Sequence, residues 1–195
     1  MTPMADFIPN QGDLSFLRFK KTGRYFGSFF TGGAQTTQAI ATVNSLRAFP
    51  FYIPLNVKFD RIAIRVTTAA TGTTPRVRLG VYQDNGSVYP GKLALDAGEV
   101  SVNTTGIKEL TIDLTLKSGK LYWLAFIGQD TTSLAVGAIP SGDALATFLG
   151  WDASLAGTPP LGYAATQTYG ALPADYPAGA ADWSLPVPLI ALRKA

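Results

Sequence analysis

Apolar and polar side chains alternate along the middle of the chain. Between residues 59 and 67, Ile62, Ile64 and Val66 alternate with Arg61 and Arg65. Since successive side chains of a β-strand point to opposite faces of its sheet, this spacing predicts a strand with one buried face. Further strands are predicted on similar grounds at residues 46–54, 76–82, 110–117, 121–127 and 187–192.

Residues that favour turns separate these segments. The Asp-Asn-Gly sequence at residues 84–86 is a strong hairpin signal, and residues 90–91 predict a further turn. Residues 118–120 predict the turn of a second hairpin, between the strands at 110–117 and 121–127. Pro50 and Pro54 predict an edge strand or one that leaves its sheet early, because proline has no N–H to donate. Short strands joined by turns predict an all-β fold, an antiparallel β-sandwich of jelly-roll type.

The two ends of the chain differ from the middle. Residues 1–22 carry too few apolar side chains for a core and are predicted to form an N-terminal arm, with the β-sandwich domain at residues 23–195. Residues 140–185 are rich in Gly, Ala and Pro and are predicted to be a long loop region. We expect the arm to contact its own domain or a neighbouring subunit, since free termini are otherwise poorly ordered. Its candidate contact residues are Phe16, Arg18, Phe19, Lys20 and Lys21.

Composition narrows the choice of function. The chain has 195 residues, 47% of them hydrophobic, which is enough for a core without disulfide bonds. It contains no histidine and no cysteine, so the common nucleophile–base pairs and soft-metal sites are excluded. The net charge of +3 is mild, and we interpret the basic-aromatic segment around the arm as a solvated turn rather than a nucleic-acid contact. No apolar run approaches the roughly 20 residues that cross a bilayer, so we expect no membrane insertion.

Several carboxylates are candidates for catalytic or metal-binding groups. Two opposed acids can hydrolyse a glycosidic bond, and the candidates are Asp84, Asp96, Glu99, Glu109 and Asp113. Calcium prefers such oxygen ligands, and Asn85 could join two of these acids, but the spacing is not that of an EF-hand. Asp84 opens a predicted turn and Asp113 lies on the outward face of a predicted strand. We therefore expect turn and surface roles, with no catalytic residue, no metal and no cofactor.

Aromatic residues are spread through the predicted loop region. Such rings give large contact areas at low entropic cost, so they form a candidate surface for a ligand or a neighbouring subunit. The alternative is that they fold inward and cap the sandwich. The residues are Trp151, Tyr163, Tyr169, Tyr176 and Trp183.

A series of short segments resembles a known domain. In order along the chain they are Gly23–Phe26, Asn44–Pro54, Phe59–Ile62, Arg78–Gly86, Tyr89–Gly91, Leu95–Gly98 and Leu121–Ala125. Together they resemble a β-rich structural domain of tailed-bacteriophage virion proteins, of the tail-fibre or minor structural protein type. The resemblance covers about the first two-thirds of the chain.

The resemblance implies a virion protein and not an enzyme. Such a protein would act in the tail, fibre or baseplate, in assembly or in attachment to the host surface. Its expected partners are other virion proteins, further copies of itself in a homo-oligomer, and a host cell-surface glycan. The alternatives are a capsid decoration protein of the same fold, a carbohydrate-binding module and a glycan hydrolase.

Overall fold

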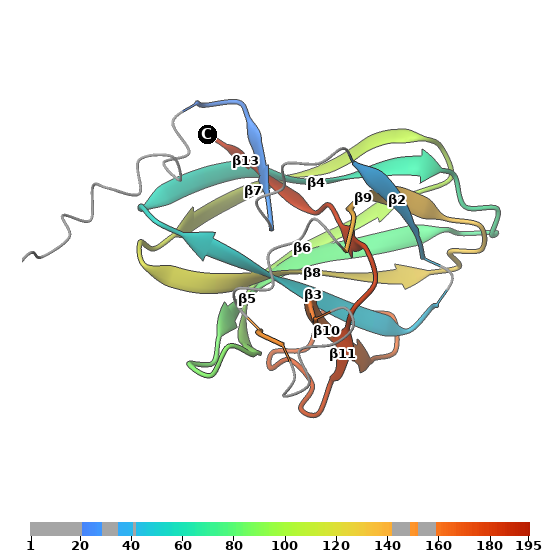
Figure 1. The fold of residues 1–195 in the computed structure, drawn as a ribbon. Coiled ribbons are helices and arrows are strands. Elements are labelled where there is room, and N and C mark those ends of the chain that lie inside the picture. The colour runs from blue at the N-terminus through green and yellow to red at the C-terminus, as the bar shows by residue number, and fades with distance from the viewer. Residues whose placement is uncertain (1–20, 29–34, 41, 142–148, 152–158) are drawn as a thin grey trace, which may run out of the picture.

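The computed structural model describes residues 21–28, 35–40, 42–141, 149–151 and 159–195, and all regular secondary structure in these ranges is β-strand (Figure 1). The strands form two antiparallel sheets in a sandwich-like arrangement. Sheet A contains β1 (Tyr25–Gly27), β2 (Thr36–Ala39), β4 (Val57–Thr68), β7 (Gly106–Leu116), β9 (Ala135–Ile139), β12 (Val187–Pro188) and β13 (Ala191–Lys194). Sheet B contains β3 (Ser45–Ile53), β5 (Arg76–Asp84), β6 (Pro90–Ser101), β8 (Lys120–Gln129), β10 (Gly162–Thr166) and β11 (Ala181–Trp183).

Sheet A is organised around β4. This long strand pairs with β7 along one side, and with β13 and then β9 along the other. The predicted alternation is confirmed here, because Ile62, Ile64 and Val66 are buried while Arg65 is exposed. β1 pairs with β13, which places the first described residues beside the C-terminal strand.

Sheet B has the strand order β11-β10-β3-β8-β5-β6. β3 has a neighbour on both sides only in its first half, because its pairing with β10 ends at Ala48 and its pairing with β8 continues to Ile53. Pro50 therefore lies where the strand has one partner, as its missing N–H requires. The prediction of an edge strand applies to this second half alone.

The main hydrophobic core fills the space between the two sheets. Phe49, Phe51 and Ile53 on β3 meet Phe59 and Ile62 on β4, and all five side chains are at most 2% exposed. Burial of large side chains on this scale, at roughly 1.5–3 kcal/mol each, is the main force that holds the sheets together.

A second hydrophobic cluster lies on the outer face of sheet B. Residues 167–180, which we name the covering segment, fold over this face and bury Tyr82 and Trp123 completely. Gly80 permits the close approach, because a Cβ atom there would lie 2.2 Å from Leu172 Cδ1 and 2.7 Å from the Leu95 carbonyl oxygen. Much of the predicted loop region is thus packed structure, and it also contains β10 and β11.

Two predictions about turns are wrong. The strands on either side of residues 118–120 do not form a hairpin, because β7 pairs with β4 in sheet A and β8 pairs with β3 and β5 in sheet B. Pro90 and Gly91 were expected to form a turn but are the first two residues of β6. The preceding loop closes one residue earlier, through a hydrogen bond from the Asn85 N–H to the Tyr89 carbonyl.

Candidate functional site

The structure places the predicted aromatic surface residues in different environments. Tyr176 is 5% exposed, and its hydroxyl lies 2.8 Å from the carbonyl oxygen of Leu46. The Tyr163 ring packs 5.5 Å from that of Trp123, and the Tyr169 hydroxyl donates to Glu99 at 2.8 Å. Tyr169 and Tyr176 therefore fasten the covering segment to sheet B, and Tyr163 packs on the outer face of the sheet to which it belongs.

Both tryptophans of this set also have clear positions. Trp183 is 8% exposed and packs edge-on against Phe49, with ring centroids 6.1 Å apart. Its ring is therefore not available to a ligand. Trp151 is 49% exposed. It alone of the five rings is exposed enough to offer the large contact area expected of a ligand surface.

A buried arginine lies beside Trp183. Arg47 is 2% exposed, and its guanidinium lies 4.6 Å from the centroid of the Trp183 ring and 5.3 Å from that of Phe126. Its Nε and Nη1 atoms have no hydrogen-bond partner among the described residues. Burial lowers the pKa of Arg47 to about 10, because a charged group is costly in an apolar environment. Alternation along β3 puts Arg47 on the same face as Phe49 and Phe51, so the sequence carries a signal that Arg47 is buried.

The carboxylates on sheet B hold the fold together. Asp96 accepts hydrogen bonds from Arg78 at 2.9 and 3.0 Å and from the Leu172 N–H at 3.0 Å, so it ties the covering segment to the sheet. Glu99 accepts from Arg76 and Tyr169, and the hydrogen bond from Tyr169 is the largest influence that lowers the pKa of Glu99.

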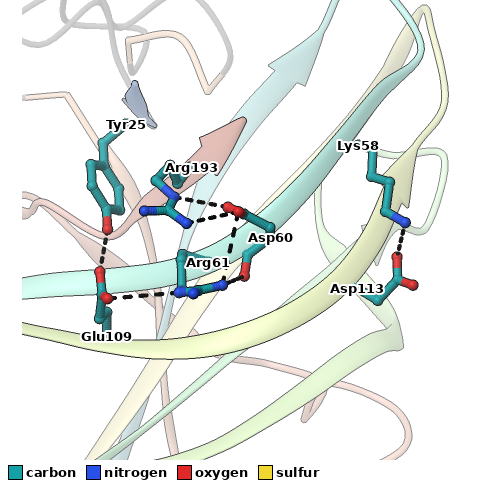
Figure 2. A network of polar contacts seen from close by, with 7 residues as sticks. All are labelled: Tyr25, Lys58, Asp60, Arg61, Glu109, Asp113 and Arg193. Carbon is teal, nitrogen blue, oxygen red and sulfur yellow. Dashed lines mark hydrogen bonds and ion pairs between the residues drawn. The ribbon is translucent and has the colours of Figure 1, made fainter. Parts of the chain in front are cut away.

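The outer face of sheet A carries a polar network across β1, β4, β7 and β13 (Figure 2). Arg193 donates to both carboxylate oxygens of Asp60 at 2.9 and 2.7 Å. Tyr25 donates to Glu109, which also lies 3.6 Å from Arg61. Hydrogen bonding by Arg193 lowers the pKa of Asp60. Each of these acids serves a cross-strand contact rather than facing a second acid across a cleft.

Two remaining candidates are also engaged. Asp113 forms an exposed ion pair with Lys58 at 3.0 Å. Asp84 accepts from the buried Trp123 Nε1 at 3.0 Å and from the Gly86 N–H at 2.8 Å, while the Asn85 side chain accepts from the Ser87 N–H. In the described ranges no group of three or more His, Cys, Asp or Glu residues is placed to hold a metal ion.

A hollow with a volume of about 860 Å³ lies at one end of the sandwich. We name it the end groove. It is bordered by the β5–β6 loop and the β7–β8 turn, green and yellow in Figure 1. Its polar side chains come from four strands and the β7–β8 turn, namely Tyr52, Gln83, Asp84, Thr115, Lys117 and Lys120.

Apart from Asp84, none of these groove residues is among the candidates predicted from the sequence. Lys117 and Lys120 lie on either side of a predicted turn, and this is a weak indication that their side chains lie close together. Tyr52 and Gln83 are separated along the chain and meet only because their strands end at the same edge. Of the predicted arm contacts, Lys21 is exposed, and Phe16, Arg18, Phe19 and Lys20 lie outside the described residues.

Comparison with family models and with curated proteins gave no match for this chain. Within the described part of the chain, no helix is long and apolar enough to cross a membrane.

Proposed function

We propose that the chain is a non-enzymatic structural protein of a tailed-bacteriophage particle. Its place would be the tail, fibre or baseplate, where it acts in assembly or in attachment to the host surface. The proposal starts from the ordered series of segments described above, whose family resemblance implies a virion component.

One structural observation supports this proposal. Segments of the resemblance that are distant in sequence form neighbouring strands of sheet B, with residues 45–53 in β3, 121–125 in β8, 78–84 in β5 and 95–98 in β6. A set of unrelated turns would have no reason to form one continuous unit. The jelly-roll connectivity is part of the proposal, and the passage of the chain from sheet B to sheet A and back through β3, β4 and β5 supports it.

The carboxylates support a non-enzymatic role. Asp60, Asp96 and Glu99 are occupied by arginine side chains, and Asp84 by backbone and indole N–H groups. A general acid or base must lie within hydrogen-bond reach of the substrate atom that gains or loses the proton. Groups that already brace strands are poorly suited to that task.

Immunogold labelling of intact particles tests the location. Antibodies raised against the purified chain are applied to the phage that encodes it, with pre-immune serum as the control. We expect gold at the tail or its tip. Gold on the head would favour the capsid decoration alternative, and particles without label would contradict a virion role.

Mass determination in solution tests the expected homo-oligomer. Analytical ultracentrifugation should give a mass that is a whole multiple of the 20.6 kDa chain. A strictly monomeric species at high protein concentration would contradict assembly through copies of this chain.

A further inference from the structure

We propose that the end groove binds an acidic saccharide. This inference gives a ligand class to the attachment role and rests on the proposed function only for its biological setting. The site is distinct from the aromatic residues predicted from the sequence as a candidate surface.

The size of the groove suits a small oligosaccharide. Ligand pockets in proteins have volumes of about 300–1,000 Å³, and this one measures about 860 Å³. Its rim combines the tip of the β5–β6 hairpin with the β7–β8 turn, which connects the two sheets. Both are held by paired strands, since β5 pairs with β6 and β8, and β7 pairs with β4. The groove is therefore formed before any ligand binds.

Two cations in the groove have no partner among the residues that the structure describes. Lys117 and Lys120 line it, and neither ammonium group forms an ion pair or hydrogen bond with a described residue. By contrast, Lys58 and Lys92 outside the groove are each paired with an aspartate at 3.0 and 2.9 Å. An anionic group on the ligand would find two free ammonium groups here.

One carboxylate in the groove indicates that the ligand also carries hydroxyl groups. Asp84 already accepts two hydrogen bonds, from Trp123 and Gly86, and both hold it in place. A carboxylate has about four lone-pair positions, so it retains capacity to accept from a ligand O–H. A simple anion would be repelled at this point, whereas the hydroxyl group of an acidic sugar would donate to it.

The remaining side chains have the chemistry that sugars need. Gln83 offers an amide donor and acceptor, Thr115 a hydroxyl, and Tyr52 a half-buried ring against which the apolar face of a sugar can stack. The side chains of Tyr52 and Gln83 make no hydrogen bond with a described residue. These groups are thus available to a ligand without breaking existing contacts.

Titration calorimetry on the full chain tests the proposal. The probes are oligosaccharides that bear uronate, sialate or phosphate groups, each beside its neutral counterpart. We expect an acidic probe to bind and its neutral counterpart to bind at least about tenfold more weakly, because hydrogen bonds to charged groups are stronger than those between neutral groups. Affinity should also fall as salt is raised.

Lys117→Ala combined with Lys120→Ala should lower the affinity for the acidic probe at least about tenfold. The matched control is Lys108→Ala combined with Lys194→Ala, which removes the same charge outside the groove and should leave affinity within about twofold. Circular dichroism and the unfolding midpoint establish that both variants fold. Tyr52→Ala should weaken acidic and neutral probes alike.

Three results would overturn the proposal. The first is that no acidic probe binds at about 10 mM. The second is equal affinity for neutral and acidic probes. The third is an equal loss of affinity in the groove variant and the control variant. Preference for an acidic peptide over every sugar would likewise contradict it. Because these assays use the isolated protein, they can fail while immunogold labelling succeeds, and the reverse also holds.

Discussion

Arg47 has the most unusual environment of any charged residue described. Its side chain enters the core between Phe126 and Trp183, where two ring faces partly compensate the lost hydration. Its Nε and Nη1 atoms have no hydrogen-bond partner in the described ranges. A buried polar atom without a partner costs roughly 1–3 kcal/mol, so this residue reduces the stability of the fold.

Arg47→Met should therefore leave the free energy of unfolding unchanged or raise it by about 1 kcal/mol, since methionine fills similar volume without a charge. Urea unfolding measures the change. Arg65→Met, at an exposed position of β4, is the control and should alter stability by less than about 0.5 kcal/mol. A loss above about 2 kcal/mol at Arg47 would mean that the guanidinium is well satisfied.

Tyr176 makes the opposite contribution. Its hydroxyl bonds the Leu46 carbonyl oxygen at 2.8 Å inside the second cluster. Tyr176→Phe should lower the free energy of unfolding by about 1–2 kcal/mol, because a buried acceptor loses its partner. Tyr52→Phe removes a hydroxyl that bonds no described residue and should have almost no effect. Equal losses in the two variants would contradict this account.

At the scale of elements, the ion pair of Asp60 with Arg193 joins β13 to the centre of sheet A. The Asp113–Lys58 pair on the same sheet is far more exposed, at 78% for the aspartate against 32% for Asp60. Because Arg193 lowers the pKa of Asp60, the stabilisation is present above the unfolded pKa and is lost as the pH falls through the folded one.

Asp60→Asn should thus speed hydrogen exchange of the β13 amides, whereas Asp113→Asn should leave it unchanged. Exchange measured near neutral pH by mass spectrometry compares the two. If both variants, or neither, accelerated exchange in β13, the pair would not be the contact that holds this strand.

The covering segment is an element held by shape as much as by polar contacts. Gly80→Ala would place a Cβ atom against Leu172 and the Leu95 carbonyl. We expect a loss of roughly 1–3 kcal/mol and faster proteolysis within residues 167–180. Gly170→Ala is the control, since a Cβ atom there meets nothing within 4 Å. Unchanged proteolysis in Gly80→Ala would show that the segment adapts to the extra methyl group.

At the scale of the whole molecule, tyrosine burial predicts alkaline instability. Burial is the main cause that raises the pKa of five tyrosines, with Tyr25 reaching about 12; the set is Tyr25, Tyr82, Tyr163, Tyr169 and Tyr176. Above about pH 10 the unfolded chain releases these protons while the folded chain retains them. Stability is therefore complete below that pH and falls as the pH rises.

Arg47 opposes this trend. Its folded pKa of about 10 lies below the unfolded one, so the folded state loses that proton first and gains stability over the same interval. One arginine against five tyrosines leaves a net loss. Urea unfolding at a series of pH values from neutral to about 11 should show this fall in the free energy of unfolding. The fall should be steeper in Arg47→Met, which lacks the opposing group. A flat profile would contradict the burial of these hydroxyls.

The sequence was most informative where the hydrophobic pattern is local. Ile62, Ile64 and Val66 indicate the buried face of β4, because successive side chains of a strand point to opposite faces. The same rule placed Asp113 on the outside. By itself, then, the sequence determined the all-β class, the main strands, and the absence of histidine and cysteine chemistry.

Only the tertiary structure decided which surfaces exist. The sequence leaves open whether Tyr176 and Trp183 face a ligand or fold inward. Contacts with Leu46 and Phe49, more than 100 positions away, place them inside. The end groove arises in the same way, since Tyr52, Gln83 and Lys117 share no local pattern. The physical reason is that burial and pocket shape depend on which strands become neighbours, and that choice minimises exposed apolar area over the whole chain rather than within any segment.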